Sequence, residues 1–228
     1  MLNTILHGDA TDQPPLLIAH GLYGSGRNWG VIAKRLSDSR QVIAVDMRNH
    51  GLSARTKTHT YADMASDLAK VVTAHSGQDG RMDVLGHSMG GKASMMLSLT
   101  RPDLVNRLVV ADIAPVAYTH SQAQFITAMR SVDLTRVERR SDAEAQLADA
   151  GVPRDLQSFF TQSLDIPNKA WRLNLDTLEH DMAHIVGFPE GITSHFEGAT
   201  LFLSGANSDY VLPEHRPNIR ALFPNSHF

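Results

Sequence analysis

The sequence of 228 residues contains no cysteine. This absence excludes disulfides, metal sites built from thiolates and a cysteine nucleophile. The chain also lacks a large excess of charge of either sign. Its 24 Asp and Glu residues and 21 Lys and Arg residues give a formal net charge of -3. Because no strong positive field would gather phosphates, we do not expect nucleic acid as a partner.

Long apolar runs are missing as well. No stretch approaches the roughly 18 apolar residues of a membrane span, and Met1–Ala10 lacks the basic head and apolar run of a signal peptide. We therefore expect a cytoplasmic protein without a membrane partner. A chain that is 42% apolar and 20% charged is typical of a globular protein, and its length fits one large domain with an insertion.

What the sequence does contain is an alternation of short apolar runs with amphipathic runs, which predicts βαβ units around a parallel sheet. Apolar residues at helical spacing predict helices at residues 61–72 and 89–100. Leu2–His7 is expected to form an antiparallel strand at the edge. The other predicted strands are Leu16–His20, Gln41–Asp46, Met82–Gly86, Leu108–Asp112 and Thr200–Ser204.

The rhythm changes between residues 117 and 190, where the pattern predicts helices and no strand. The predicted helices are Ser121–Val132, Asp142–Ala150, Arg154–Ser163 and Asn174–Ile185. A helical block between two strands is most simply a cap over the carboxyl edge of the sheet, where open α/β sheets bind ligands. We therefore expect a core of residues 1–116 and 191–228, interrupted by a helical cap of residues 117–190.

The sequence GHSMG at residues 86–90 follows a predicted strand and precedes a predicted helix. G-x-S-x-G in that context is the nucleophile elbow, in which a serine on a strained turn projects its hydroxyl at the head of a helix. Ser88 is therefore the predicted nucleophile. The N–H of Met89 would be one donor of an oxyanion hole. The alternative is a chance match in an ordinary strand-to-helix turn.

A second motif, His20-Gly21-Leu22, directly follows the first predicted parallel strand. In this arrangement the loop after an early strand supplies the second oxyanion donor, so we assign that role to the N–H of Leu22. Gly21 lets the backbone approach a substrate closely. His20 and Gly21 are therefore candidate substrate-binding residues.

Several segments together resemble a known family. They are HGLYGS at residues 20–25, DMRNHGLS at 46–53, GHSMGGK at 86–92, DIAPV at 112–116 and GANSDYV at 205–211, with WRLN at 171–174 and HIVG at 184–187. The chain resembles the YbfF-type esterases, close relatives of the ABHD11 hydrolases, over nearly its whole length. The resemblance implies the α/β-hydrolase fold: a mostly parallel central sheet flanked by helices, with an inserted helical cap.

The resemblance also implies an activity and a binding site. The activity is that of a serine carboxylesterase on short- to medium-chain acyl esters, with acyl thioesters as further candidates. His87 is a candidate substrate-binding residue, and a structural role for His87 and His50 is an equal alternative. We expect a small-molecule acyl ester as partner, no cofactor, and a monomer or small homo-oligomer.

The acid of the catalytic triad departs from the usual pattern of the fold. Most α/β hydrolases carry it about three residues beyond a glycine such as Gly205, but that position is Ser208 here. The resemblance implies that Asp112, at the end of the preceding strand, takes part together with Ser208. Asp112 as a simple turn cap and Asp209 as the acid stay open as alternatives.

The base of the triad has no obvious candidate. Triad order in this fold is serine, acid, histidine, and the histidine follows the last strand. The resemblance puts only the start of that strand at Asn225-Ser226-His227-Phe228, so we expect the histidine beyond Phe228, together with the rest of the strand and a final helix. A pseudoenzyme and a substitute histidine elsewhere are the alternatives.

Two further possibilities concern chemistry outside ester hydrolysis. His180 and His184 are four residues apart on a predicted helix, but no Glu lies between them as in metalloproteases, so we expect no metal site. The same elbow would also serve a carbon–carbon bond hydrolase or a perhydrolase. A non-catalytic ligand-binding protein on the same scaffold is the rival from another class.

Overall fold

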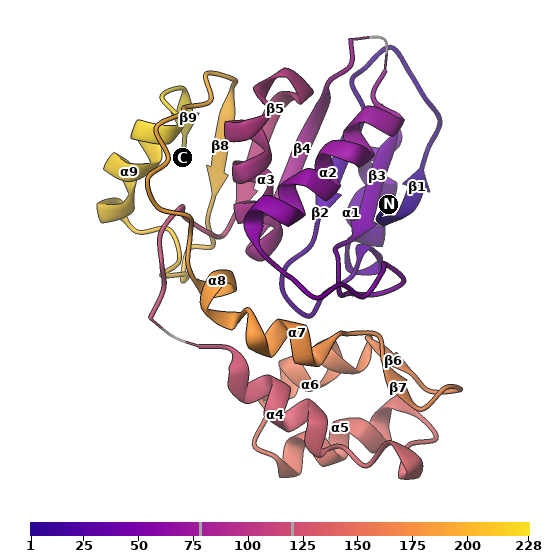
Figure 1. Cartoon of the computed structure of the whole chain (residues 1–228). Coiled ribbons are helices and arrows are strands. Elements are labelled where there is room, and N and C mark those ends of the chain that lie inside the picture. The colour runs from indigo at the N-terminus through magenta and orange to yellow at the C-terminus, as the bar shows by residue number, and fades with distance from the viewer. Residues whose placement is uncertain (78, 120) are drawn as a thin grey trace.

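A seven-stranded sheet forms the centre of the computed structural model, which describes residues 1–77, 79–119 and 121–228 (Figure 1). The strand order is β1-β3-β2-β4-β5-β8-β9. Their bounds are β1 (Asn3–His7), β2 (Leu16–Ala19), β3 (Val42–Asp46), β4 (Met82–His87), β5 (Val105–Ala111), β8 (Thr200–Leu203) and β9 (Ser226–His227). Among the described residues of this sheet, only the β1–β3 pair is antiparallel. The predicted fold class and antiparallel edge strand are confirmed.

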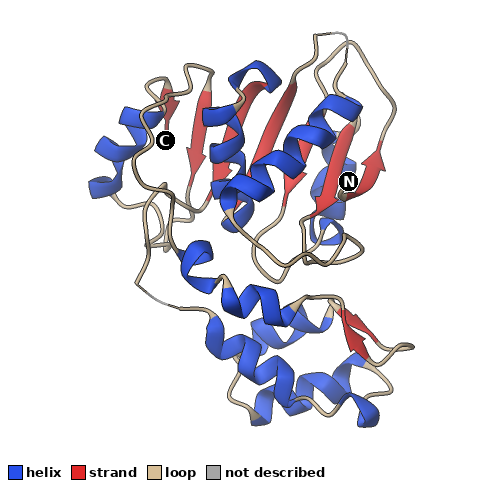
Figure 2. Ribbon diagram, viewed as in Figure 1, coloured by secondary structure: helices blue, strands red, loops and turns tan. Residues whose placement is uncertain are grey.

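Helices cover both faces of this sheet (Figure 2). Alternate residues of one strand serve opposite faces: Leu16 and Ile18 pack with Ala33 on one side, whereas Leu17 belongs to the larger core on the other. Burial on both faces explains why the strands are almost continuously apolar. The flanking helices are α1 (Gly30–Leu36), α2 (Tyr61–His75), α3 (Met89–Thr100) and α9 (Arg216–Leu222), with 3-10 turns at Gly26–Trp29, Pro102–Leu104 and Pro213–His215.

Between β5 and β8 the chain forms a layer of helices beyond the carboxyl ends of the parallel strands (Figure 1). Its elements, called the cap below, are α4 (Ala123–Ser131), a 3-10 turn at Leu134–Arg136, α5 (Arg140–Asp149), α6 (Arg154–Thr161), β6 (Leu164–Asp165), β7 (Ala170–Trp171), α7 (Leu175–His180) and α8 (Met182–Val186). The expectation of no strand is wrong here, because β6 and β7 form an antiparallel hairpin. Strands of two residues are too short to leave an alternating pattern in the sequence.

The helix predicted over Asn174–Ile185 is two helices, divided at Asp181. The side chain of Asp181 is buried and accepts a hydrogen bond from the backbone N–H of His59, which belongs to the core. A contact more than 100 residues away in sequence thus accompanies the break, and no local pattern announces it.

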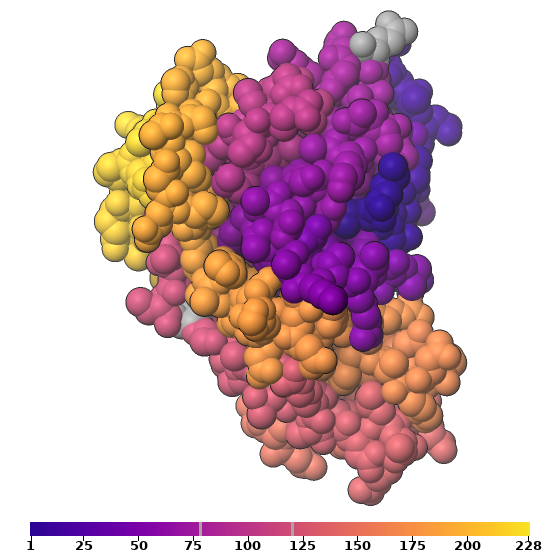
Figure 3. Space-filling model, viewed as in Figure 1, coloured from indigo at the N-terminus to yellow at the C-terminus, as the bar shows by residue number. Residues whose placement is uncertain are grey.

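The cap is held against the core by hydrogen bonds to the loop after β3. The amide of Asn174 donates to Asn49 Oδ1 and to the carbonyl of Thr56, both at 3.0 Å. Arg55 donates to the carbonyl of Trp171 at 2.8 Å. In the space-filling view the cap segments lie directly on this part of the core (Figure 3). These contacts fix one wall of the space above the sheet.

The last strand begins at the place predicted from the sequence. In β9, Ser226 pairs with Thr200 and His227 with Leu201, both in parallel register. None of the helices in the described ranges has the length and apolarity needed to cross a membrane.

Candidate active site

Ser88 lies between β4 and α3 with φ 51° and ψ -120°. A residue other than glycine at positive φ is strained, and such strain gathers at functional sites. The Ser88 N–H donates to the carbonyl of Ala111 at 3.0 Å, and its own carbonyl accepts from the Lys92 N–H at 3.0 Å. The hydroxyl does not cap the helix, and Ser88 lines the main cavity. This is the conformation expected of a nucleophile elbow.

The loop after β2 lies directly over the elbow. A Cβ added to Gly21 would stand 3.3 Å from the Cβ of Ser88 and 2.9 Å from Nδ1 of His87. A side chain at residue 21 would therefore separate the two segments. Leu22 and Met89 both line the cavity, and within the described part of the chain neither N–H donates to a protein acceptor. Both are thus available to an oxyanion.

His20 is buried beside this loop, and both of its ring nitrogens are engaged by the backbone. Nε2 accepts the N–H of Met47 at 2.9 Å, and Nδ1 lies 2.7 Å from the carbonyl oxygen of Gly21. Since Nε2 accepts, the proton must be on Nδ1, which donates to Gly21. His20 borders the cavity, but its polar atoms are committed to the protein.

His50 is held by the backbone in the same way as His20. Its Nε2 accepts the N–H of Tyr23 at 3.1 Å, and its Nδ1–H donates to the carbonyl of Arg48 at 2.8 Å. The rings of His20 and His50 meet edge to face with centroids 5.1 Å apart. Of the two roles open to His50, the contacts describe the structural one.

His59, which the sequence analysis did not single out, completes the row. Its ring centroid is 5.4 Å from that of His50. Nδ1 accepts from the amide of Asn49 at 3.2 Å, so Nε2 carries the proton and points at the sulfur of Met89, 3.2 Å away. The three buried histidines, named the histidine stack below, thus run from the oxyanion loop to the elbow.

Burial keeps the histidine stack uncharged. Desolvation lowers the pKa of His20 from 6.5 to about 4, although the nearby Asp46 charge acts in the opposite direction. Desolvation, together with the smaller effect of the positive charge of Arg48, lowers the pKa of His59 to about 3. The pKa of His50 lies well below 6.5 for the same main reason. All three rings are neutral at physiological pH.

These lowered pKa values predict an acid-sensitive fold. At a pH between the pKa of His20 in the folded chain, about 4, and its ordinary value of 6.5, the unfolded chain binds more protons than the folded chain. The stability of the fold is therefore highest above about pH 6.5 and decreases as the pH falls toward 4. We expect the free energy of unfolding to drop by on the order of 2 kcal/mol or more between pH 7 and pH 5. Urea unfolding at several pH values measures this. His59→Gln should flatten the dependence, whereas His180→Gln, at an exposed position, should not; equal slopes in both variants would contradict the assignment.

Asp112 and Ser208 meet at one loop. Asp112 follows β5 with φ 56° and donates its N–H to the carbonyl of Leu203 at 2.7 Å, and its Oδ1 accepts the N–H of Gly205 at 3.3 Å. Ser208 donates its N–H to the carbonyl of Gly205 at 3.1 Å. Asp209, the other candidate acid, is exposed. Asp112 and Ser208 therefore each contact Gly205, Asp112 through the Gly205 N–H and Ser208 through the Gly205 carbonyl.

His87 lies within the electrostatic influence of this acid. Burial lowers its pKa, and the negative charge of Asp112 raises it in part. His87 lines the cavity beside Ser88. Among the described residues no histidine forms a hydrogen bond with the Ser88 hydroxyl, and His227 lies in a strand at the sheet edge.

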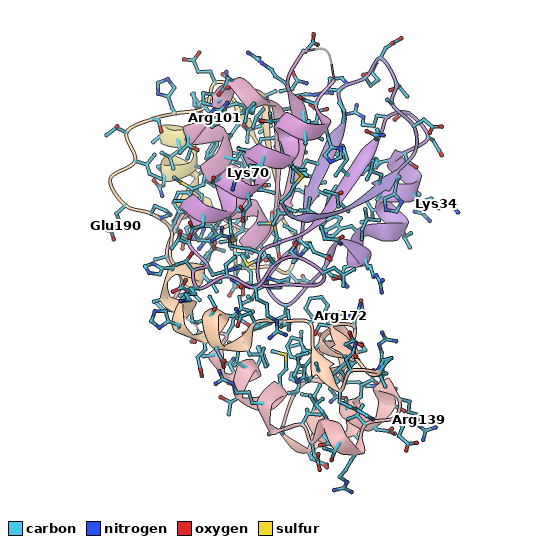
Figure 4. The ribbon with its side chains drawn as sticks, turned by 45° about the vertical axis from the view of Figure 1, so that its right-hand side comes forward. Lys34, Lys70, Arg101, Arg139, Arg172 and Glu190 are labelled. Carbon is cyan, nitrogen blue, oxygen red and sulfur yellow. The ribbon has the colours of Figure 1, made fainter. Side chains whose placement is uncertain are left out.

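The cavity above Ser88 has a volume of about 450 Å³. Core loops form one side, and the cap supplies apolar side chains on the other. The apolar cap residues that line it are Phe125, Leu156, Phe159, Phe160, Ile185 and Val186. None of the described lining residues is Asp, Glu or Arg. Charged side chains such as Lys34 and Arg139 point away from the protein (Figure 4). Because its lining is mostly apolar, the cavity suits an uncharged, apolar ligand.

Lys92 is the one lysine among the described residues that line the cavity, and no sequence pattern predicted a role for it. Its ammonium donates to the carbonyls of Val186 and Gly187 at 2.9 and 2.6 Å and lies 4.7 Å from the ring centre of Tyr118. Burial lowers its pKa to about 7. Tyr61 holds the neighbouring carbonyl of Ile185 at 2.6 Å. The end of α8 is thereby fixed to α2 and α3.

His180 and His184 do not share a helix. They lie on α7 and α8 respectively, and both are exposed. Within the described ranges, no three or more His, Cys, Asp or Glu side chains are arranged so that they could hold a metal ion.

Comparison with known proteins places these features in context. The α/β-hydrolase fold family matches residues 14–228. The chain is 40% identical over 226 residues to the sn-1-specific diacylglycerol lipase ABHD11 of Danio rerio, covering 93% of this chain and 69% of that protein. It is 36% identical over 220 residues to esterase YbfF of Escherichia coli K12, covering 94% and 83%. A solved marine microorganism esterase superposes with a TM-score of 0.91 at 34% identity, covering 99% of this chain and 88% of the other.

Proposed function

This chain belongs to the α/β-hydrolase fold family and is a carboxylic ester hydrolase, and from that premise we propose that Ser88 is its acyl-accepting nucleophile for short- to medium-chain esters. The observation that carries the proposal is the position of Ser88: strained, at the head of α3, and open to an apolar cavity beside two unengaged N–H groups. The proposed nucleophile, the two oxyanion donors and the acyl site then all line the same cavity.

The proposed reaction has two halves. Ser88 Oγ attacks the ester carbonyl while its proton passes to a histidine base. The N–H groups of Leu22 and Met89 hold the oxyanion, and the protonated base then returns the proton to the leaving alcohol. Water repeats the sequence on the acyl-enzyme and releases the acid. Asp112, assisted by Ser208, would orient the base and stabilise its cationic form. Substrate contacts of His20, Gly21 and His87 belong to this proposal.

The acyl group is proposed from the size and lining of the cavity. Small-molecule sites span roughly 300–1,000 Å³, and a cavity of about 450 Å³ is at the small end of that range. Because the cap supplies six apolar side chains to its lining, chain length should decide the fit. The division into a core of residues 1–116 and 191–228 and a cap of 117–190 is also proposed. The cytoplasmic location and the monomeric or small homo-oligomeric state stay predictions.

Hydrolysis of p-nitrophenyl acetate, butyrate, octanoate and palmitate tests the proposed acyl range. We expect kcat/KM to be highest for butyrate or octanoate and about tenfold or more lower for palmitate, since the longest chain exceeds the cavity. The curated relative named as a diacylglycerol lipase adds a diacylglycerol to the panel. Palmitate as the best substrate would contradict the proposed chain length. Turnover of a diketone without any ester turnover would favour the carbon–carbon hydrolase.

Covalent labelling tests the nucleophile separately from the substrate range. Diethyl p-nitrophenyl phosphate should add one diethylphosphoryl group per chain, and peptide mass spectrometry should find it on Ser88. A label on any other residue would refute the assignment of the nucleophile. A non-catalytic binding protein would take no label.

A further inference from the structure

The direction of the Leu22 N–H is set by the carbonyl oxygen of Gly21, because both belong to the same peptide group. The peptide between Gly21 and Leu22 is planar and trans, so its carbonyl oxygen and its N–H point to opposite sides. The Gly21 carbonyl accepts two hydrogen bonds, from Nδ1 of His20 at 2.7 Å and from the N–H of Gly24 at 3.0 Å. Anchoring that carbonyl fixes where the Leu22 N–H points.

The next peptide group is anchored by the second histidine. His50 accepts the N–H of Tyr23 at 3.1 Å. The two peptide groups on either side of the Leu22 Cα are therefore each held by one imidazole ring. The ring of His50 is itself fixed by its bond to the carbonyl of Arg48, so the oxyanion loop has little freedom to turn.

The third histidine reaches the other oxyanion donor. His59 Nε2 lies 3.2 Å from the sulfur of Met89, the residue whose N–H is the other proposed oxyanion donor. The three rings are in contact in the order His20, His50, His59, with centroid distances of 5.1 and 5.4 Å. One continuous row thus joins both halves of the oxyanion hole.

We propose that the histidine stack of His20, His50 and His59 positions the two oxyanion donors, and that it does so only as three neutral rings of fixed tautomer. These are positioning residues, since their polar atoms contact the protein and not the reacting atoms. The proposal rests on the proposed function of Ser88, Leu22 and Met89. It adds a role to His50 and His59 that the elbow and the oxyanion loop alone do not require.

Neutrality follows from the hydrogen bonds themselves. Each ring has one nitrogen that accepts an N–H, from Met47, Tyr23 or Asn49. A proton added to that nitrogen would turn it into a donor facing the N–H that it now accepts, and the hydrogen bond would be lost. The charges that influence the stack are Asp46 beside His20 and both Arg48 and Asp63 beside His59, while His87 is the other titratable group near His20.

His50 offers the sharpest test because it is not itself among the residues that line the cavity. His50→Phe keeps an aromatic ring of similar size but removes both hydrogen bonds. His50→Gln keeps an amide that can accept the Tyr23 N–H. His7→Phe is the matched control, since His7 lies in β1 at the sheet edge and its Nε2 has no hydrogen-bond partner in the described structure.

The readout is a pair of competitive inhibitors that differ in their demand on the oxyanion hole. A hexyl trifluoromethyl ketone forms a tetrahedral adduct with a serine and places an oxyanion in the hole, whereas hexyl methyl ketone only occupies the acyl site. The ratio of their inhibition constants reports oxyanion binding, independent of ester turnover. Fluorine NMR identifies the tetrahedral adduct directly.

In His50→Phe we expect this ratio to fall by about a hundredfold, the typical effect of losing one oxyanion donor. The methyl ketone constant should stay within about twofold, because the acyl site is untouched. His50→Gln should recover at least about tenfold of the loss, and His7→Phe should match the wild type. Thermal unfolding of each variant identifies any that fails to fold, and His50→Gln then carries the comparison.

The outcomes separate the two claims. A folded His50→Phe or His50→Gln variant with the wild-type ratio and its full adduct signal would overturn the role of the stack and leave the proposed function intact. A wild-type protein that forms no adduct and shows no preference for the trifluoromethyl ketone would overturn the proposed oxyanion site itself, and the inference with it. A loss of both inhibitors in equal proportion would show a general packing role and would also overturn the inference.

Discussion

Ser88→Ala should lower kcat/KM for p-nitrophenyl butyrate by about 10⁴-fold or more, since removal of a triad serine leaves only binding and oxyanion stabilisation. Fold and substrate binding should persist, because the Ser88 backbone bonds to Ala111 and Lys92 do not involve the side chain and the hydroxyl does not cap α3. The measurement is initial rates for the two purified proteins, with circular dichroism spectra to compare their folds.

Ser98→Ala is the matched control for this substitution. Ser98 lies in the same helix, is buried, and bonds only to the carbonyl of Met95 one turn earlier. Its hydroxyl does not line the cavity, so the variant should hydrolyse butyrate at the wild-type rate within about twofold. Equal turnover by wild type and Ser88→Ala would remove Ser88 from the reaction and with it the assignment of the elbow.

Gly90→Ala should damage both stability and activity. A Cβ at residue 90 would stand 2.4 Å from the carbonyl oxygen of Ala19 and 2.5 Å from that of His20. Both are backbone atoms at the end of β2, so either α3 leaves the sheet or the oxyanion loop shifts. We expect a loss of about 3 kcal/mol in the free energy of unfolding and about a hundredfold in kcat/KM, as for a misplaced catalytic geometry.

Gly30→Ala provides the comparison in another helix. Gly30 has helical φ and ψ values of -52° and -41°, and an added Cβ would meet no atom within 4 Å. Alanine there should stabilise the protein by about 0.5–1 kcal/mol, with unchanged activity. Urea unfolding and butyrate hydrolysis check both variants. If Gly90→Ala behaved like Gly30→Ala, the close approach of α3 to the oxyanion loop would be wrong.

The contacts of the cap give the acyl cavity a defined wall. Lys92 and Tyr61 hold the last carbonyls of α8, and Asn174 joins the hairpin side of the cap to the loop after β3. The cap is therefore attached to the core at more than one place. Since Lys92 lies one helical turn after Ser88, the helix that begins at the proposed nucleophile also supports the cap wall of the cavity.

Some of this protein is determined by short stretches of sequence. Continuous apolar runs predicted the strands, because burial on both faces of a sheet requires them. The elbow was predicted because glycines at residues 86 and 90 and a serine between them meet a local demand of the backbone. Such features depend on neighbours a few residues away, so a single sequence contains the whole signal.

Other features were decided only by the tertiary structure. Nothing local distinguishes His59 from an ordinary surface histidine, because its role depends on Asn49 and Met89, 10 and 30 residues away. The cap hairpin, the break at Asp181 and the buried ammonium of Lys92 likewise depend on partners distant in sequence. Asp112 and Ser208 could be paired only through the family resemblance, and the fold then brought both to Gly205. The sequence by itself determined the sheet and predicted the proposed nucleophile, whereas long-range packing decided which polar groups surround them.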